Sequence, residues 1–150
     1  MIVETQGQAL TVAMEMERRA IRTYERALML TDDADVRRGI QNMLSDEKCH
    51  LKRFTEMWDK TEMSAEERLL LQAMGAEVLF QGGVTEMARE NALTTIEGLY
   101  RYAMESEQNA VQTYTKFAEQ CTGEAKQAFL EIVREEAGHL IEIRDRLAKE

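Results

Sequence analysis

The sequence predicts an all-α fold, a four-helix bundle of two repeated helical hairpins. The 150-residue chain contains no proline, and 31% of its residues are charged, a composition that suits long helices joined by short turns. Apolar residues recur at helical spacing over four long stretches. The first half of the chain is also repeated in the second. The length gives room for one domain, residues 1–150.

The first predicted hairpin covers residues 4–59, with helices over residues 4–30 and 34–59. Between them, the sequence TDDAD offers Asp32 or Asp33 as the N-cap of the second helix. Each helix has one largely apolar face. On the first helix this face consists of Leu10, Ala13, Glu17, Ala20, Tyr24 and Leu28. On the second it consists of Ile40, Met43, Glu47, His50, Phe54 and Met57.

A long crossover, residues 60–93, connects the two hairpins. Within it, Ser64 and Glu67 have capping-box spacing and Gly75 offers a stop, so we predict a short helix there. Residues 76–83, AEVLFQGG, look like a viral protease site used to remove expression tags. This stretch is either an engineered insertion or a coincidence, and no function is inferred from it.

The second predicted hairpin covers residues 94–148. Thr94 and Glu97 have capping-box spacing at the start of a helix that continues to Gln120. The sequence CTGE interrupts the chain, and the last helix covers residues 124–148. The apolar face of the third long helix consists of Ile96, Ala103, Glu107, Ala110, Tyr114 and Phe117. That of the fourth consists of Phe129, Ile132, Glu136, His139, Ile143 and Leu147.

The two hairpins share a sequence pattern. ERRAIRTY at residues 17–24 matches EQNAVQTY at residues 107–114, and DEKCHL at residues 46–51 matches EEAGHL at residues 135–140. Two hairpins of equal construction predict a bundle with an approximate internal twofold axis.

Four carboxylates and both histidines of the chain fall on the faces predicted to form the core. They are Glu17, Glu47, His50, Glu107, Glu136 and His139. Buried carboxylates are costly and repel one another, and two divalent cations would balance the charge of the four glutamates. The sequence therefore predicts a dinuclear metal site. Carboxylate oxygens with one imidazole per ion suit iron, with manganese as an alternative, better than zinc.

One Glu-x-x-His motif on a helix is weak evidence for a metal site, because both residues are common on helix surfaces. Two copies, each paired with an upstream core glutamate, are far more specific. The neighbouring residues leave alternatives open. Tyr24 and Tyr114 either pack in the core or donate hydrogen bonds to a ligand. Asp46 and Glu135 either orient the histidines of neighbouring helices or are solvated charges.

The overall charge limits the classes of partner. The formal net charge of −9 argues against nucleic acid and anionic membrane surfaces. We see no secretory signal at the N-terminus and no membrane-spanning apolar run. Cys49 and Cys121 form no CxxC pair, so neither a disulfide framework nor a cysteine-based metal site is indicated. We expect a soluble cytoplasmic protein.

The six predicted ligands and the repeated Glu-x-x-Ala-x-x-x-Tyr pattern resemble the ferritin-like superfamily, and within it the rubrerythrin-like di-iron proteins. The resemblance covers the four long helices but not the crossover. It implies two iron ions held by the six ligands, with Tyr24 and Tyr114 as catalytic residues that tune bound oxygen species. It also implies a homodimeric oxidoreductase that reduces hydrogen peroxide or dioxygen in defence against oxidative stress.

The chain departs from rubrerythrins in two ways, and from bacterioferritins in one. It lacks the paired CxxC motifs of a rubredoxin domain, so electrons would come from an external donor such as a rubredoxin-like protein. Ala110 stands where rubrerythrins usually have a further glutamate, which makes the ligand set symmetric, as in bacterioferritins. Lys48 replaces the methionine through which a bacterioferritin would bind haem. A ferroxidase that stores iron in a large hollow assembly, and a non-catalytic bundle stabilised by metal, are the alternatives.

Overall fold

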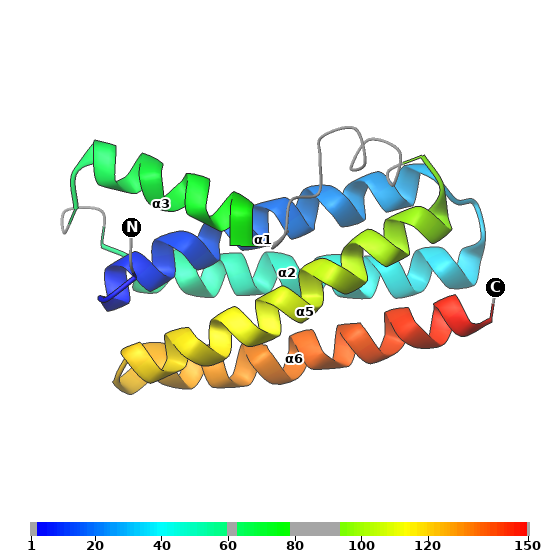
Figure 1. Cartoon of the computed structure of the whole chain (residues 1–150). Coiled ribbons are helices and arrows are strands. Elements are labelled where there is room, and N and C mark those ends of the chain that lie inside the picture. Colours follow the sequence, from blue (N-terminus) through cyan, green and yellow to red (C-terminus); the bar gives the residue numbers. More distant parts are fainter. Residues whose placement is uncertain (1–2, 60–62, 79–93, 150) are drawn as a thin grey trace.

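The computed structural model describes residues 3–59, 63–78 and 94–149, and these residues form an all-helical fold (Figure 1). The all-α prediction is confirmed. The helices are α1 (Gln6–Met29), α2 (Ala34–Met57), α3 (Ala65–Val78), α5 (Ile96–Gln120) and α6 (Gly123–Ala148).

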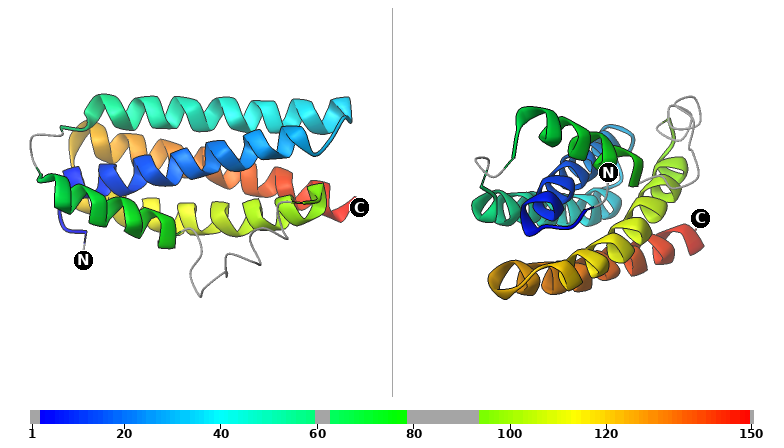
Figure 2. Two further views of the ribbon diagram at one scale, coloured as in Figure 1. Left: turned by 90° about the horizontal axis from the view of Figure 1, so that it is seen from above. Right: turned by 60° about the vertical axis from the view of Figure 1, so that its left-hand side comes forward.

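The four long helices pack side by side as two antiparallel pairs (Figure 1). α1 contacts α2 and α5, and α6 contacts α5 and α2, so each long helix has two long neighbours. α2 ends and α5 begins at opposite ends of the bundle. α3 lies along α1 and also touches α5 (Figure 2). The short helix in the crossover is therefore confirmed, while residues 60–62 and 79–93 of this connection lie outside the described residues.

The first two long helices begin close to where the sequence predicts. Thr5 caps α1 in a reciprocal capping box with Gln8, so the helix begins two residues later than predicted. Asp33, one of the two predicted caps, accepts hydrogen bonds from the backbone N–H groups of Asp35 and Val36. α2 ends at Met57, two residues before its predicted end.

The predicted cap of α5 is wrong by one residue. Thr95, not Thr94, is the N-cap, and its hydroxyl accepts from the backbone N–H of Gly98 at 3.0 Å. Two adjacent threonines offer the same capping chemistry, and spacing alone does not choose between them. The side chain of Glu97 contacts Arg101 at 3.0 Å. α6 begins at Gly123, one residue earlier than predicted.

The predicted stop of α3 at Gly75 is also wrong, because the helix continues to Val78. Among the described residues only Gly123 has a positive φ, so Gly75 is not a left-handed helix end. A Cβ on Gly75 would lie 3.0 Å from both Glu15 Cβ and the carbonyl oxygen of Val12. The glycine thus allows α3 to approach α1 closely. The predicted cap at Ser64 is confirmed, since its hydroxyl accepts from the backbone N–H of Glu67 at 3.1 Å.

Two apolar clusters fill the bundle, one on each side of the predicted ligands. One cluster includes Phe54, Tyr114 and Phe129, and the other includes Tyr100 and Ile143. Burial of these side chains supplies most of the stabilisation of such a bundle. The polar residues between the clusters are consequently cut off from solvent on both sides along the bundle axis. No helix among the described residues is long and apolar enough to cross a membrane.

Candidate metal centre

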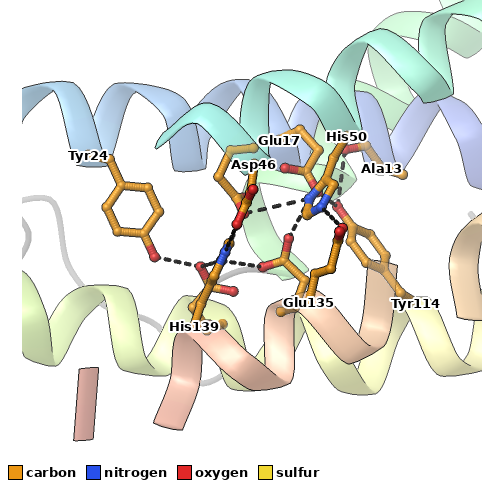
Figure 3. Close-up of polar contacts among 11 residues, drawn as sticks. Ala13, Glu17, Tyr24, Asp46, His50, Tyr114, Glu135 and His139 are labelled. Atoms are coloured by element: carbon orange, nitrogen blue, oxygen red, sulfur yellow. Dashed lines mark hydrogen bonds and ion pairs between the residues drawn. The ribbon is translucent and has the colours of Figure 1, made fainter. Parts of the chain in front are cut away.

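All six predicted ligands lie close together in the bundle, one or two on each long helix. Figure 3 shows Glu17, His50 and His139 among them. α1 and α5 each supply one glutamate, while α2 and α6 each supply a glutamate and a histidine three residues later. Residues three apart share a helix face, so the Glu-x-x-His spacing turns both side chains of each pair inward. All six are buried, with exposed fractions between 1% and 5%.

The six side chains form two overlapping groups that could hold a metal ion. The first group is Glu17, Glu47, His50 and Glu136, and the second is Glu47, Glu107, Glu136 and His139. Within each group, one ligand atom from every residue lies within 4.8 Å of the others. Glu47 and Glu136 belong to both groups. Two adjacent cation positions joined by shared carboxylates fit this arrangement.

His50 is held between two sets of carboxylates. Its Nδ1 atom faces the centre, 2.8 Å from Glu136 Oε1 and 3.5 Å from Glu17 Oε1. Its Nε2 atom faces outward and lies 2.5 Å from Glu135 Oε2 (Figure 3). A proton on Nε2, shared with Glu135, makes Nδ1 the ring nitrogen that can bind a cation once it has lost its own proton.

His139 repeats this arrangement on the other side of the site. Its Nδ1 atom lies 3.1 Å from Glu47 Oε1 and 3.5 Å from Glu107 Oε1. Its Nε2 atom lies 2.9 Å from Asp46 Oδ2 (Figure 3). Each outward carboxylate comes from the helix that does not carry the histidine it contacts. Of the two alternatives for Asp46 and Glu135, the structure thus supports orientation of the histidines, although both carboxylates remain about half exposed.

The two core tyrosines contact the glutamates that are not followed by a histidine. The Tyr24 hydroxyl donates to Glu107 Oε1 at 2.5 Å, and the Tyr114 hydroxyl donates to Glu17 Oε1 at 2.9 Å. Tyr24 and Glu17 lie on α1, while Tyr114 and Glu107 lie on α5, so the contacts cross between these helices. The hydrogen-bonding alternative for both tyrosines is therefore supported.

Burial and mutual repulsion dominate the electrostatics of the carboxylates. Burial and the neighbouring charge of Glu136 raise the pKa of Glu17, and they raise the pKa values of Glu47 and Glu107 well above the usual range. Burial also acts to raise the pKa of Glu136, but hydrogen bonds from Glu107 and both histidines outweigh it and hold this pKa well below its usual range. One carboxylate of the cluster thus stays charged while its neighbours favour protons.

The histidines gain positive charge from the same surroundings. Burial lowers the pKa of His50, but its contacts with Glu136 and Glu17 outweigh burial and raise the pKa to about 11. Burial acts likewise on His139, and its contacts with Glu107 and Glu136 raise its pKa to about 12. Without a metal ion, the cluster therefore attracts protons to balance its charge. A site that draws protons so strongly will also draw divalent cations.

A small cavity of about 10 Å³ adjoins the site. It touches all four glutamates but neither histidine, so it lies on the side of α1 and α5. Ala20, Ser106 and Ala110 line it, and their small side chains leave this space open. A volume of this size accommodates about one water-sized molecule.

Sequence patterns did not identify every residue around the site. Ser106 and Met16 line the cavity beside Glu107 and Glu17, but neither residue type suggests this position. Only their sequence adjacency to predicted ligands could have indicated it. Cys49 and Lys48, which flank His50 and Glu47 in the sequence, are exposed.

Comparisons with models of protein families, with curated proteins and with solved structures find no match for this chain. The ferritin-like resemblance carried by the six ligands therefore stays a prediction. The buried groups of glutamates and histidines are the observation from which function has to be inferred.

Proposed function

We propose that this chain is a ferritin-like, non-haem di-iron oxidoreductase, similar to rubrerythrins without their rubredoxin domain. It reduces hydrogen peroxide or dioxygen with electrons from an external donor, such as a rubredoxin-like protein, and acts as a cytoplasmic homodimer. The observation that supports this most directly is the pair of overlapping ligand groups, with Glu47 and Glu136 common to both. Manganese is the alternative metal.

The side chains fit a pair of metal ions because each has a donor atom left over. Every one of the six ligands has one buried side-chain atom that makes no hydrogen bond of good geometry, although His50 Nδ1 lies 2.8 Å from Glu136 Oε1 and His139 Nδ1 lies 3.1 Å from Glu47 Oε1. These atoms are Glu17 Oε2, Glu47 Oε1, His50 Nδ1, Glu107 Oε2, Glu136 Oε1 and His139 Nδ1. Among these atoms, Glu17 Oε2 and Glu107 Oε2 have neither a hydrogen bond nor an ion pair within the described residues, and buried polar atoms in that position are costly unless something else satisfies them. Oxygen and imidazole nitrogen ligands in this ratio match iron or manganese.

Residues around the six ligands orient the imidazoles and hold protons beside the glutamates. Asp46 and Glu135 fix the orientation of the two imidazoles, so that Nδ1 of each points toward the carboxylates. Burial, together with the charge of nearby carboxylates, raises the pKa values of Tyr24 and Tyr114 well above 10, so both phenols keep their protons at neutral pH. These protons lie beside Glu107 and Glu17. We propose that the tyrosines are the catalytic residues that hold protons next to the reacting oxygen atoms.

When bound, two iron ions would supply the two electrons that the reduction of peroxide to water requires, with two protons consumed. The cavity beside the four glutamates holds about one water-sized molecule, and so small a space favours a small oxidant such as peroxide or dioxygen over an organic substrate. The cavity walls of Ala20, Ser106 and Ala110 would exclude larger molecules.

The decisive experiment combines metal content with reactivity. The protein loaded with iron should hold close to two ions per chain. After anaerobic reduction, one equivalent of peroxide per iron pair should oxidise it, with the near-ultraviolet absorption of ferric iron as the readout. The variant His139→Ala should lose iron and reactivity, whereas Cys121→Ser, which changes a buried residue outside the site, should keep both. A stoichiometry of one ion per wild-type chain would contradict the paired site.

The symmetric ligand set, with Ala110 buried beside the cavity, favours a second candidate, a ferroxidase that handles iron for storage. Size-exclusion chromatography separates the two functions, because storage requires a large hollow assembly and the peroxidase would be a dimer. Oxidation of many added ferrous ions by dioxygen, followed by mineral formation, would establish storage. A di-iron form inert to both oxidants would leave only a structural role for the metal.

A further inference from the structure

A second cleft lies on the surface between α1, α3 and the residue that follows α2. Its volume is about 340 Å³, in the range of pockets that bind small molecules. α1 contributes Thr11, Met14 and Arg18, which share one helix face at spacings of three and four residues. α3 contributes Arg68, Leu69 and Gln72, and Trp58 completes the wall.

The ring of Trp58 has a fixed position in this cleft. Its Nε1–H donates to the hydroxyl of Thr11 at 2.7 Å, and that hydroxyl donates in turn to the carbonyl of Gly7 at 2.8 Å. Trp58 also packs against the apolar cluster around Phe54. Its polar atom is thus already satisfied, and what it offers to the cleft is a preoriented aromatic surface.

The polar side of the cleft is positively charged, although the chain as a whole carries −9. Arg18 lies 3.3 Å from Glu15, but Arg19 and Arg22 contact the same carboxylate at 3.1 and 3.6 Å. The single negative charge of Glu15 is therefore shared among three arginines and does not neutralise Arg18 alone. Within residues 3–59, 63–78 and 94–149, no carboxylate lies within ion-pair distance of Arg68, and none lines the cleft. Two guanidinium groups beside an apolar surface favour an anion, which they can bind through paired hydrogen bonds.

We propose that this cleft binds a small anionic molecule with an aromatic body, such as an aryl phosphate. The aromatic part stacks on Trp58 and contacts Met14, and the anionic group lies between Arg18 and Arg68. The site is separate from the six metal ligands, and its existence does not depend on the proposed oxidoreductase activity. None of its lining residues is shared with the cavity beside the four glutamates.

The chain has one tryptophan, so a single indole N–H signal in a ¹H–¹⁵N correlation spectrum reports directly on this cleft. The full-length protein should be titrated separately with 1-naphthyl phosphate, 1-naphthol and inorganic phosphate. We expect a saturable shift with 1-naphthyl phosphate, half-complete at a concentration at least about tenfold lower than with either other probe. Equal affinity for 1-naphthyl phosphate and 1-naphthol would overturn the proposal, as would the absence of a saturable shift.

Variants then test the contribution of charge. Arg68→Gln should raise the half-saturating concentration of 1-naphthyl phosphate at least about fivefold and leave that of 1-naphthol unchanged. Arg144→Gln, at an exposed position on α6 outside the cleft, is the matched control and should change neither. Circular dichroism checks that both variants are folded. Equal weakening by both substitutions would show a general charge effect and overturn the assignment to this cleft.

Discussion

Loading the metal-free protein with a divalent cation should release protons into solution. The perturbation is the addition of two equivalents of Mn²⁺ or Co²⁺ under anaerobic conditions. Both ions stay divalent there, so no redox reaction contributes to the proton count. His50 and His139 have pKa values near 11 and 12 in the metal-free site, so both are protonated at pH 7. A cation at Nδ1 requires a neutral imidazole, and the proton on that atom must leave.

The protonated groups of the site determine how many protons per chain should be released. Two histidines give a minimum of about two protons per chain, and protons held by Glu47 and Glu107, whose pKa values are raised by burial, would add to it. For each proton that the metal displaces, metal affinity rises about tenfold when the pH increases by one unit, as long as the pH stays below the pKa of the group in the folded protein. Loading of both ions should therefore become roughly 100-fold more favourable for each unit of pH between about 7 and 9.

Isothermal titration calorimetry in PIPES and in HEPES measures this number, because the two buffers bind these ions weakly and differ in their heat of protonation. His50→Ala should release about one proton per chain fewer than the wild type when both proteins are loaded with two ions. Cys121→Ser should release the same number as the wild type, since Cys121 belongs to neither ligand group. Release of fewer than about one proton per chain at full loading would refute the charge distribution described for the site.

Three further predictions follow from the same structure. The metal-free protein should melt at a lower temperature at pH 9 than at pH 6.5, because histidine pKa values raised above their unfolded value near 6.5 contribute stability that is lost as pH rises toward about 11; a melting temperature that rises with pH would contradict this. Asp46→Asn should weaken metal binding about 10- to 100-fold in a chelator competition assay, while Asp35→Asn, at the exposed start of α2, should have no effect. Gly75→Ala should destabilise the protein by about 1–3 kcal/mol in urea unfolding because its Cβ would meet α1, whereas Gly138→Ala, with nothing within 4 Å, should stabilise it by up to about 1 kcal/mol.

Much of the fold and the ligand set could be predicted because both depend on periodicity. A carboxylate such as Glu47 on an apolar helix face is anomalous in itself, and the structure buries it at 1% exposure. The repeat then pairs it with Glu136. Helix ends were less predictable, as Thr94 and Thr95 illustrate. Gly75 was misassigned because a glycine that ends a helix and a glycine that admits a neighbouring helix look alike in sequence.

Contacts between distant helices could be suggested but not established from the sequence. Asp46 precedes Glu47 by one residue, and only the packing of α2 against α6 brings its carboxylate 2.9 Å from His139. The hydrogen bond from Trp58 to Thr11 gave no sequence signal at all, since it joins residues 47 positions apart. Such contacts depend on where one helix lies relative to another, which periodicity within each helix does not specify.

The division of the ligands between the two hairpins has a consequence for biosynthesis. The group around His50 draws three residues from the first hairpin, but it is completed only by Glu136 on α6. The group around His139 likewise needs Glu47 from the first hairpin. A nascent chain emerging from the ribosome can therefore assemble neither complete group until nearly all of α6 has been synthesised and the hairpins have docked. Tight metal capture would then wait for the second hairpin, so that a chain in which only the first hairpin had formed would not carry a metal ion in a complete site.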